Sequence, residues 1–414
     1  MTRLALSLAL SLAACSGAGR DSTAGTRPAA PAVHAEPVPS ASPAPAPAPA
    51  PTPAVEPAPS ASPAPAPSPA PQAPPAAREP IELTFVGDVI FGRYRDAGYD
   101  PIPGPDDKPF AEILDTMRSD LLVGNLETPL VRDLPDKSPI GAKYRFGASK
   151  EMARHLVDGG FTAMSLANNH AFDQRAPGML ESPEILKELG IIALGAARTD
   201  APLFRVETIE RKGWKVGFLA VTARRNAPHF EGTPELPFLS TTELEDKLGP
   251  LIDAAKATHD LVIVFIHWGD EYADAPAGYQ RTHAKRLLDR GAHLVVGHHP
   301  HVLQGIEQYG AGAVAYSLGN FLFENTNAIP RLSGVLRARF TPGPCLAKLT
   351  FHPAYIKRAP TKHPAPATGA LGKAVKTRMR TLSEGLGTAL VDEADDLVLT
   401  GFACAGQAAP ALAK

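Results

Sequence analysis

The chain has 414 residues, with 41 basic and 43 acidic side chains and a formal net charge of −2. This balance lacks the basic excess of a nucleic-acid-binding protein and the acidic run of a solvating tail. No apolar stretch reaches the roughly 18–20 residues of a membrane-spanning helix, which excludes a polytopic membrane protein. Of the 44 prolines, 20 lie in residues 1–80, so folding is expected in the remainder, which is long enough for one large core.

Residues 1–15 have the pattern of a secretory signal peptide. A single basic residue, Arg3, precedes a short apolar run that ends in small residues before Cys15. The tetrapeptide LAAC resembles the lipobox of bacterial lipoproteins, which makes Cys15 the predicted lipidation site and membrane anchor. The alternative is a short buried helix, but the adjoining segment offers no apolar partner. Ser16 follows Cys15 where inner-membrane lipoproteins often have Asp, which favours the outer membrane.

Residues 16–80 are predicted to form a disordered tether. Their Pro-Ala repeats favour polyproline II, which rises about 3.1 Å per residue and would give a reach on the order of 200 Å. A tether of that length would hold a domain away from a membrane, in the periplasm or at the cell surface. The alternative, a ligand for a proline-binding domain, is disfavoured because basic flanks are absent.

Residues 81–357 read as one α/β domain, because short apolar runs alternate with helix-like segments. Further strands are expected within 335–357, and residues 358–414 form a C-terminal extension to which no structure is assigned. The strands are expected at 81–87, 121–124, 161–167, 215–221, 261–267, 293–297 and 313–318, and the helices at 109–119, 148–158, 178–189, 241–257 and 277–290.

Polar clusters follow almost every predicted strand. Sites in α/β sheets form beyond the carboxyl ends of the strands, so these clusters are expected to converge. Each has an alternative: Asp88 is also a plausible helix cap, Glu127 a support for a turn at Asn125, and the run 168–170 ordinary turn chemistry. The clusters are Asp88, Asn125 with Glu127, Asn168–His170, His267, and His299 with His301.

The histidines indicate a metal site. His267 closes the most apolar strand, and the segment Gly297–His301 places three histidines within five residues. Imidazole nitrogens together with carboxylate oxygens are typical ligands of Zn, Mn or Fe. The alternative is a structural histidine cluster, in which every buried ring needs its own partner. His298 is the one histidine of this segment that is not expected to bind the metal. For Cys345 and Cys404, pairing and free thiols both remain open.

Seven motifs occur along the chain in the order VGDVIFGR, VGNLETPL, KYRFGAS, SLANNHAFD, FIHWGDEY, GHHPHVLQGIE and YSLGNFLF. Together they resemble the CapA-type poly-γ-glutamate capsule synthesis proteins, over residues 82–324 and in the order of that family. This family is similar to the calcineurin-like metallophosphatases, so the resemblance implies a four-layer α/β/β/α sandwich of the metallo-dependent phosphatase type.

The resemblance also implies roles for individual residues. Glu127 would bridge two divalent metal ions, and His170 would stabilise charge or protonate a leaving oxygen. The implied metal ligands are Asp88, Glu127, Asn169, His267, His299 and His301. The implied catalytic residues are His170, Asp173 and Glu271, and those near the substrate are Arg93, Arg145, Tyr272 and Asn320.

One position departs from the metallophosphatase pattern. Those enzymes carry a histidine two residues after the first aspartate, where this chain has Ile90, so the first metal site is short of a ligand. The predicted function is a lipid-anchored metal-dependent hydrolase or transferase acting on an anionic envelope polymer, with one or two ions of Mn, Fe or Zn. Capsule synthesis or export proteins are the expected partners. A non-catalytic component of an export assembly is the alternative, and Ile90 argues against a plain phosphodiesterase.

Overall fold

The computed structural model describes residues 78–141, 143–197, 202–227, 234–324, 327–358 and 362–404. The predicted signal peptide, Cys15 and the tether up to residue 77 lie outside the described residues. Within the described ranges, no helix is both long enough and apolar enough to cross a membrane.

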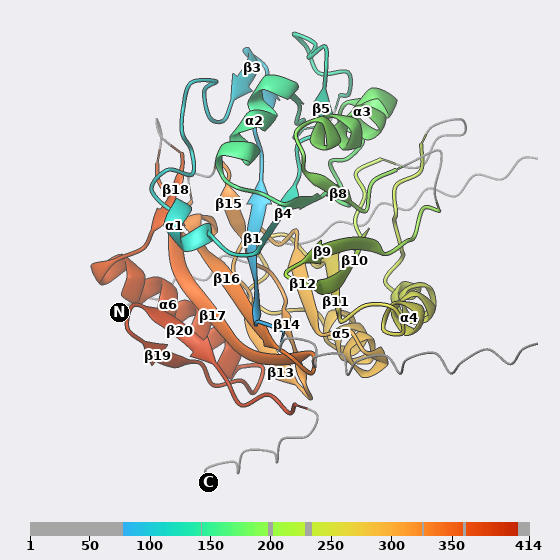
Figure 1. Cartoon of the computed structure of the whole chain (residues 1–414). Helices are drawn as coiled ribbons and strands as arrows, with labels where there is room; N and C mark the ends of the chain where they lie inside the picture. The colour runs from blue at the N-terminus through green and yellow to red at the C-terminus, as the bar shows by residue number, and fades with distance from the viewer. Residues whose placement is uncertain are drawn as a thin grey trace, which may run out of the picture. The chain divides into compact units, whose positions relative to one another are not determined.

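The first sheet combines a parallel half with an antiparallel half, joined at β1 (Figure 1). The parallel strands are β1 (Ile81–Val89), β4 (Leu121–Leu126), β7 (Ala163–Ser165), β8 (Ile192–Leu194) and β15 (Asn320–Leu322). The antiparallel strands are β16 (Leu332–Thr341), β17 (Cys345–Ile356), β18 (Pro364–Pro366), β19 (Val391–Glu393) and β20 (Asp396–Leu399).

The second sheet has the order β13-β14-β12-β11-β10-β9. Its strands are β9 (Glu207–Arg211), β10 (Trp214–Thr222), β11 (Leu261–His267), β12 (Leu294–His298), β13 (Ile306–Tyr309) and β14 (Gly312–Ala315). Two short ribbons complete the strands, β2 (Gly92–Arg95) with β3 (Gly98–Pro101), and β5 (Leu130–Val131) with β6 (Ala148–Ser149).

The two sheets pack face to face, and helices cover their outer faces. Side chains alternate along each strand: Phe85 points into the core between the sheets, whereas Val86 packs under the helices of the first sheet. The predicted four-layer α/β/β/α sandwich is confirmed. On the first sheet lie α1 (Leu114–Met117), α2 (Lys150–Asp158) and α3 (Arg175–Glu188), and on the second α4 (Leu244–Ala255) and α5 (Gly278–Arg290).

All seven predicted strands are present, but the predicted helix at 109–119 is wrong over most of its length. Only α1 is helical there. The preceding segment forms tight turns instead, in which Ala111 N donates to Lys108 O and Ile113 N to Phe110 O, both over 3.1 Å. These bonds span three residues, so the chain turns too tightly for an α-helix to begin.

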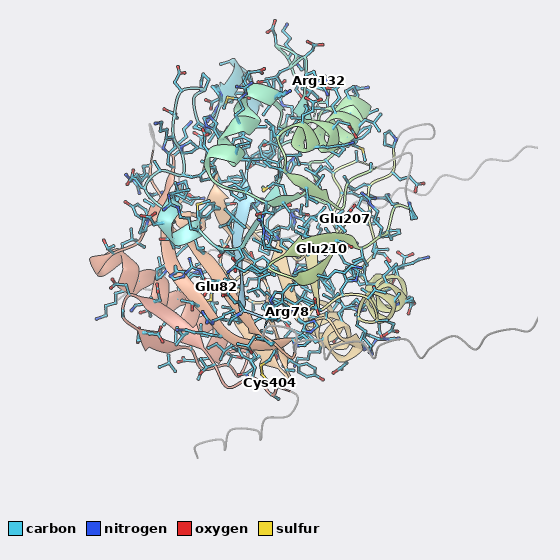
Figure 2. All side chains as sticks on the ribbon, in the orientation of Figure 1. Arg78, Glu82, Arg132, Glu207, Glu210 and Cys404 are labelled. Atoms are coloured by element: carbon cyan, nitrogen blue, oxygen red, sulfur yellow. A yellow bond between two sulfur atoms is a disulfide. The ribbon has the colours of Figure 1, made fainter. Side chains whose placement is uncertain are left out.

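The residues after 357 continue the same sheet. They contain β18, β19, β20 and α6 (Gly369–Glu384), which packs against β17 and β13. A short 3-10 turn, Ile329–Arg331, lies earlier in the chain, directly before β16. A disulfide joins Cys345 to Cys404, with 5.2 Å between their Cα atoms. In Figure 2, Cys404 lies at the lower end of the view and Arg132, beside α3, at the upper end.

Candidate metal centre

Strand register brings the predicted ligands together. Asp88 lies opposite Asn125 where β1 and β4 end, and His267 lies opposite His298 where β11 and β12 end. Because both sheets end at the same place, their polar residues meet between the layers. Two groups of buried side chains result, each with potential ligand atoms within 4.8 Å of one another. They share Glu127: one is Asp88, Glu127 and His301, and the other is Glu127, His267 and His299.

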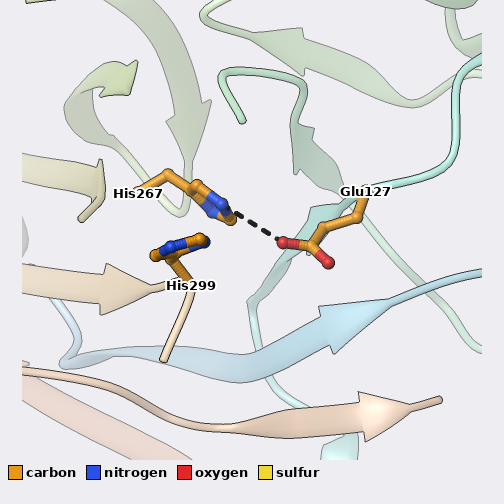
Figure 3. Close-up of side chains that lie close together, drawn as sticks. All are labelled: Glu127, His267 and His299. Carbon is orange, nitrogen blue, oxygen red and sulfur yellow. Dashed lines mark ion pairs between the residues drawn. The ribbon is translucent and has the colours of Figure 1, made fainter. Parts of the chain in front are cut away.

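The second group is shown in Figure 3, where His267 and His299 face the Glu127 carboxylate. His267 Nε2 lies 3.2 Å from Glu127 Oε1, and the two imidazole rings are 4.8 Å apart. Asn169 adds a fourth potential ligand, because its Oδ1 atom lies 2.7 Å from His267 Nε2. Carboxylate, amide and two imidazoles are a donor set that suits a divalent transition metal.

The first group is poorer in donors. His301 Nδ1 lies 3.3 Å from Asp88 Oδ2, and Glu127 is the third member. Ile90 has a hydrocarbon side chain and supplies no ligand atom, and it packs in a buried apolar cluster with Ile102 and Phe146. The shortage of one ligand, predicted from the sequence, thus corresponds to an apolar wall beside this group.

Buried polar atoms without partners test whether a cation fits. Asp88 Oδ2, both carboxylate oxygens of Glu127 and His299 Nδ1 are buried and make no hydrogen bond to any described residue. Leaving such atoms unpaired costs folding free energy. These atoms belong to three of the predicted ligands. One divalent cation in each group would give these atoms a partner, so the donor set fits the predicted metal centre.

The pKa values of these side chains reflect the same arrangement. Burial, reinforced by the negative charge of Asp88, raises the pKa of Glu127 to about 8. Burial lowers the pKa of His299 to about 3, which keeps its ring neutral and able to bind a metal. Burial also opposes protonation of His301, but the Glu127 charge and the adjacent Asp88 outweigh it and raise its pKa to about 9. The carboxylates of Glu127 and Asp88 that favour the proton on His301 would also attract a metal cation.

His170 and Asp173 form a buried dyad beside the metal-ligand groups. His170 Nδ1 donates to Asp173 Oδ2 over 2.8 Å, and Phe146 N donates to the same oxygen. Burial lowers the pKa of His170, but the Asp173 charge and hydrogen bond outweigh it, so the pKa is raised overall. Asp173 therefore orients the ring of His170 and favours its protonated form.

Several supporting residues had no assigned role in the sequence prediction. Asn125 Nδ2 donates to Asp88 Oδ1 over 2.8 Å, and Asn168 Nδ2 donates to Leu126 O. Asn226, which follows β10, accepts a hydrogen bond from Asn169 Nδ2 over 3.0 Å. Its position just beyond a strand end is the one sequence signal that marks it.

The backbone is strained at the same edge. Of the seven non-glycine residues with left-handed φ among the described residues, four lie here: Arg175, Tyr272, His299 and His301. The φ angles of the two histidines are 98° and 57°. Such conformations cost of order 1–3 kcal/mol each and cluster at functional sites.

A cavity of about 380 Å³ opens onto His170 and His301. Three residues predicted near the reaction or the substrate, Arg93, Glu271 and Tyr272, line this cavity. Two others, Arg145 and Asn320, do not line it. The Arg145 side chain lies 3.6 Å from Asp96. Asn320 is fully buried, and its Oδ1 atom lies 2.9 Å from His301 Nδ1, so it positions that ring.

Comparison with protein families matches residues 82–325 to the family described as "Bacterial capsule synthesis protein PGA_cap". The sequence is 31% identical over 256 residues to the capsule biosynthesis protein CapA of Bacillus anthracis, covering 59% of this chain and 60% of that protein. It is 33% identical over 261 residues to the PGA biosynthesis protein CapA of Bacillus subtilis (strain 168), covering 59% and 63%. The chain thus spans about 60% of the length of these relatives.

Solved structures that match this chain include a 5'-nucleotidase from Candida albicans and a hypothetical protein from Thermus thermophilus. The first has 11% sequence identity and a TM-score of 0.39, and covers 75% of this chain and 60% of its own. The second has 18% identity and a TM-score of 0.38, and covers 69% of this chain and 96% of its own.

Proposed function

Because the chain belongs to the bacterial capsule synthesis family PGA_cap, we propose that it is a metal-dependent hydrolase or transferase that acts on an anionic envelope polymer. The polymer would be poly-γ-glutamate or a capsular polysaccharide, handled during synthesis, export or attachment. The names of the CapA relatives support a role in capsule biosynthesis. The LAAC motif supports an extracytoplasmic location with a lipid anchor at Cys15.

One observation carries this proposal: two groups of buried ligand atoms share Glu127, and a His–Asp dyad lies beside them. Residues that serve only the fold rarely leave carboxylate oxygens buried and unpaired. The combination suits hydrolysis or group transfer, which needs both an activated nucleophile and a proton donor.

Divalent cations held by these groups would supply an activated water and polarise the attacked bond. The chain's own residues supply the proton and orient the substrate. His170 uses Nδ1 to bond Asp173, which leaves its other ring nitrogen to hold a proton for the leaving atom. Glu271 and Tyr272 border the cavity, where they would orient the polymer beside the dyad.

The test combines elemental analysis with turnover. We expect the purified protein, incubated with Mn, Fe(II) or Zn, to bind one to two equivalents and to cleave or transfer the polymer. His170→Gln should keep the metal and lower turnover by roughly 10²–10⁴-fold, because it removes the proton donor. A protein that binds none of the three metals would refute the proposal, as would a His170→Gln variant with unchanged turnover.

The second candidate is a non-catalytic metal-binding component of a capsule export assembly. The missing donor at Ile90 favours it, because a weak first site suits binding better than two-metal chemistry. Under this alternative the protein would bind metal but turn over no phosphodiester, amide or ester substrate.

The lipid anchor has its own test. Cys15→Ser should move the protein from the membrane fraction to the soluble extracytoplasmic fraction and abolish incorporation of labelled fatty acid. Retention of the Cys15→Ser variant in the membrane would contradict the anchor and leave the proposed chemistry unaffected.

A further inference from the structure

Three cationic side chains converge on one carboxylate in the wall of the cavity beside the metal centre. Arg93 and Arg95 both contact Glu324 Oε2, and Lys362 Nζ lies 3.3 Å from Glu324 Oε1. A second carboxylate, that of Asp100, lies 2.6 Å from Arg95 Nε and 3.8 Å from Lys362 Nζ. The cluster of these five residues therefore has three positive and two negative charges.

The cluster is built from segments far apart in the sequence. Arg93 and Arg95 are two residues apart on β2, so both point to the same side of that ribbon. Asp100 lies on the paired strand β3, and Glu324 follows β15. The left-handed φ of Lys362, 53°, is a strained conformation for a lysine.

Glu324 lines the same cavity as His170 and His301. Its neighbour Phe323 packs against the His301 ring, with 4.9 Å between the ring centres. An anion held where the Glu324 carboxylate lies would therefore face the metal-ligand groups across one cavity. The Glu324 side chain is only 15% exposed, so its carboxylate is enclosed by the cations.

We propose that the Glu324 carboxylate occupies, in the ligand-free protein, a subsite for a carboxylate group of the substrate. This inference deepens the proposed function, on which it rests. Two arginines and a lysine around one carboxylate are the donors that a bound carboxylate would also use. Arg93 Nε is buried and lies 3.9 Å from Asp100 Oδ2 without making a hydrogen bond to a described residue, so it can still donate to a bound carboxylate.

Substrate binds at this subsite by exchange of one carboxylate for another. The entering carboxylate pairs with the three cations in place of Glu324, and the Glu324 side chain then turns towards the open cavity. Because one carboxylate replaces another, the number of charged pairs is conserved and binding is reversible. Such exchange suits a polymer that carries many carboxylates and must move through the site.

Calorimetric titration of the full chain with glutarate tests this inference, after a chelator has removed metal so that only the protein binds the probe. Glu324→Gln should bind glutarate about tenfold more tightly, because the competing charge is gone. Arg95→Gln should bind it about tenfold more weakly, because it removes one charged donor. Glu112→Gln is the matched control and should behave like the parent, since the pair of Glu112 with Lys357 does not line the cavity.

Unchanged or weaker glutarate binding by Glu324→Gln would overturn the inference, and so would a parent that prefers inorganic phosphate to glutarate. If Glu324→Gln unfolds, Glu324→Asp decides, because a shorter carboxylate competes less well and should bind glutarate more tightly than the parent. The titration involves neither metal nor turnover. Its failure is therefore distinguishable from failure of the proposed function.

Discussion

The two ends of the parallel strands differ in what they bury. At the carboxyl ends lie Asp88 and Glu127, whose carboxylates include buried oxygens that make no hydrogen bond to a described residue, next to histidines in left-handed conformations. At the amino ends lie hydrogen-bonded and covalent contacts: buried Trp214 donates to Glu79 O over 2.8 Å, and the Cys345–Cys404 disulfide lies beyond the amino end of β1.

The two edges therefore contribute differently: one contains the candidate reactive groups, and the other contains contacts that stabilise the fold. Buried polar atoms without hydrogen bonds cost folding free energy, so the edge that contains the metal-ligand groups is expected to destabilise the metal-free protein. The opposite edge offsets that cost through covalent and apolar contacts. Substitutions at the two edges should therefore affect different measurements.

The largest expected effect comes from Glu127→Gln, which changes the one residue shared by both groups. Metal affinity should fall by more than about 100-fold, because the variant loses a charged ligand, not only an outer-shell partner. At pH 7 the metal-free variant should unfold at about the same temperature as the metal-free parent, because the raised pKa of about 8 leaves the Glu127 side chain largely uncharged. Elemental analysis and thermal unfolding check the two effects, and a variant that keeps both metals would contradict the assignment.

The next largest effect should come from the opposite edge. A Cys345→Ala/Cys404→Ala double variant should lose about 2–4 kcal/mol of stability, because the disulfide no longer restricts the unfolded chain. Urea unfolding measures this loss, and the parent treated with a reducing agent is the control. Metal content should not change. Loss of metal in the variant would show that the two edges are coupled.

A smaller gain is expected from Ile90→His, which adds the donor that the first group lacks. The affinity of the more weakly held metal should rise about tenfold, within the range by which single changes around a metal alter its affinity. Ile90→Val is the matched control, because it keeps an apolar side chain in the same cluster. Titration with Mn measures the second equivalent. Equal affinities in the two variants would show that this wall does not limit the site.

The smallest effect concerns His293, which lies just before β12 and accepts a hydrogen bond from Val262 N over 3.1 Å. Burial lowers its pKa to about 4. Since the unfolded side chain titrates near 6.5, its contribution to stability is present above that pH and is lost as the pH falls towards 4. His293→Asn keeps an acceptor but does not titrate. Thermal unfolding should therefore show a smaller loss between pH 7.5 and 5 in this variant than in the parent.

Much of the site is predictable because its residues follow strands that the sequence marks clearly. His267 ends a continuous apolar run, and its register with β10 and β12 places it at the common edge. Pairing between distant segments is not predictable in this way. Arg95 and Lys362 meet at Glu324 only because β15 and the segment after β17 return to the same ribbon.

Helix α6 shows another limit. Its buried positions, Gly372, Val375, Met379 and Ser383, have helical spacing, but glycine and serine give no apolar signal. The helix is therefore visible only once its packing against β17 and β13 is known.

The disulfide also makes the C-terminal part of the domain a closed covalent ring. Cys345 and Cys404 are 59 residues apart, and the ring contains α6 and β20. A protease that cuts one peptide bond within the ring would leave both pieces attached. The cut protein would migrate as one chain on a non-reducing gel and as two fragments once the disulfide is reduced.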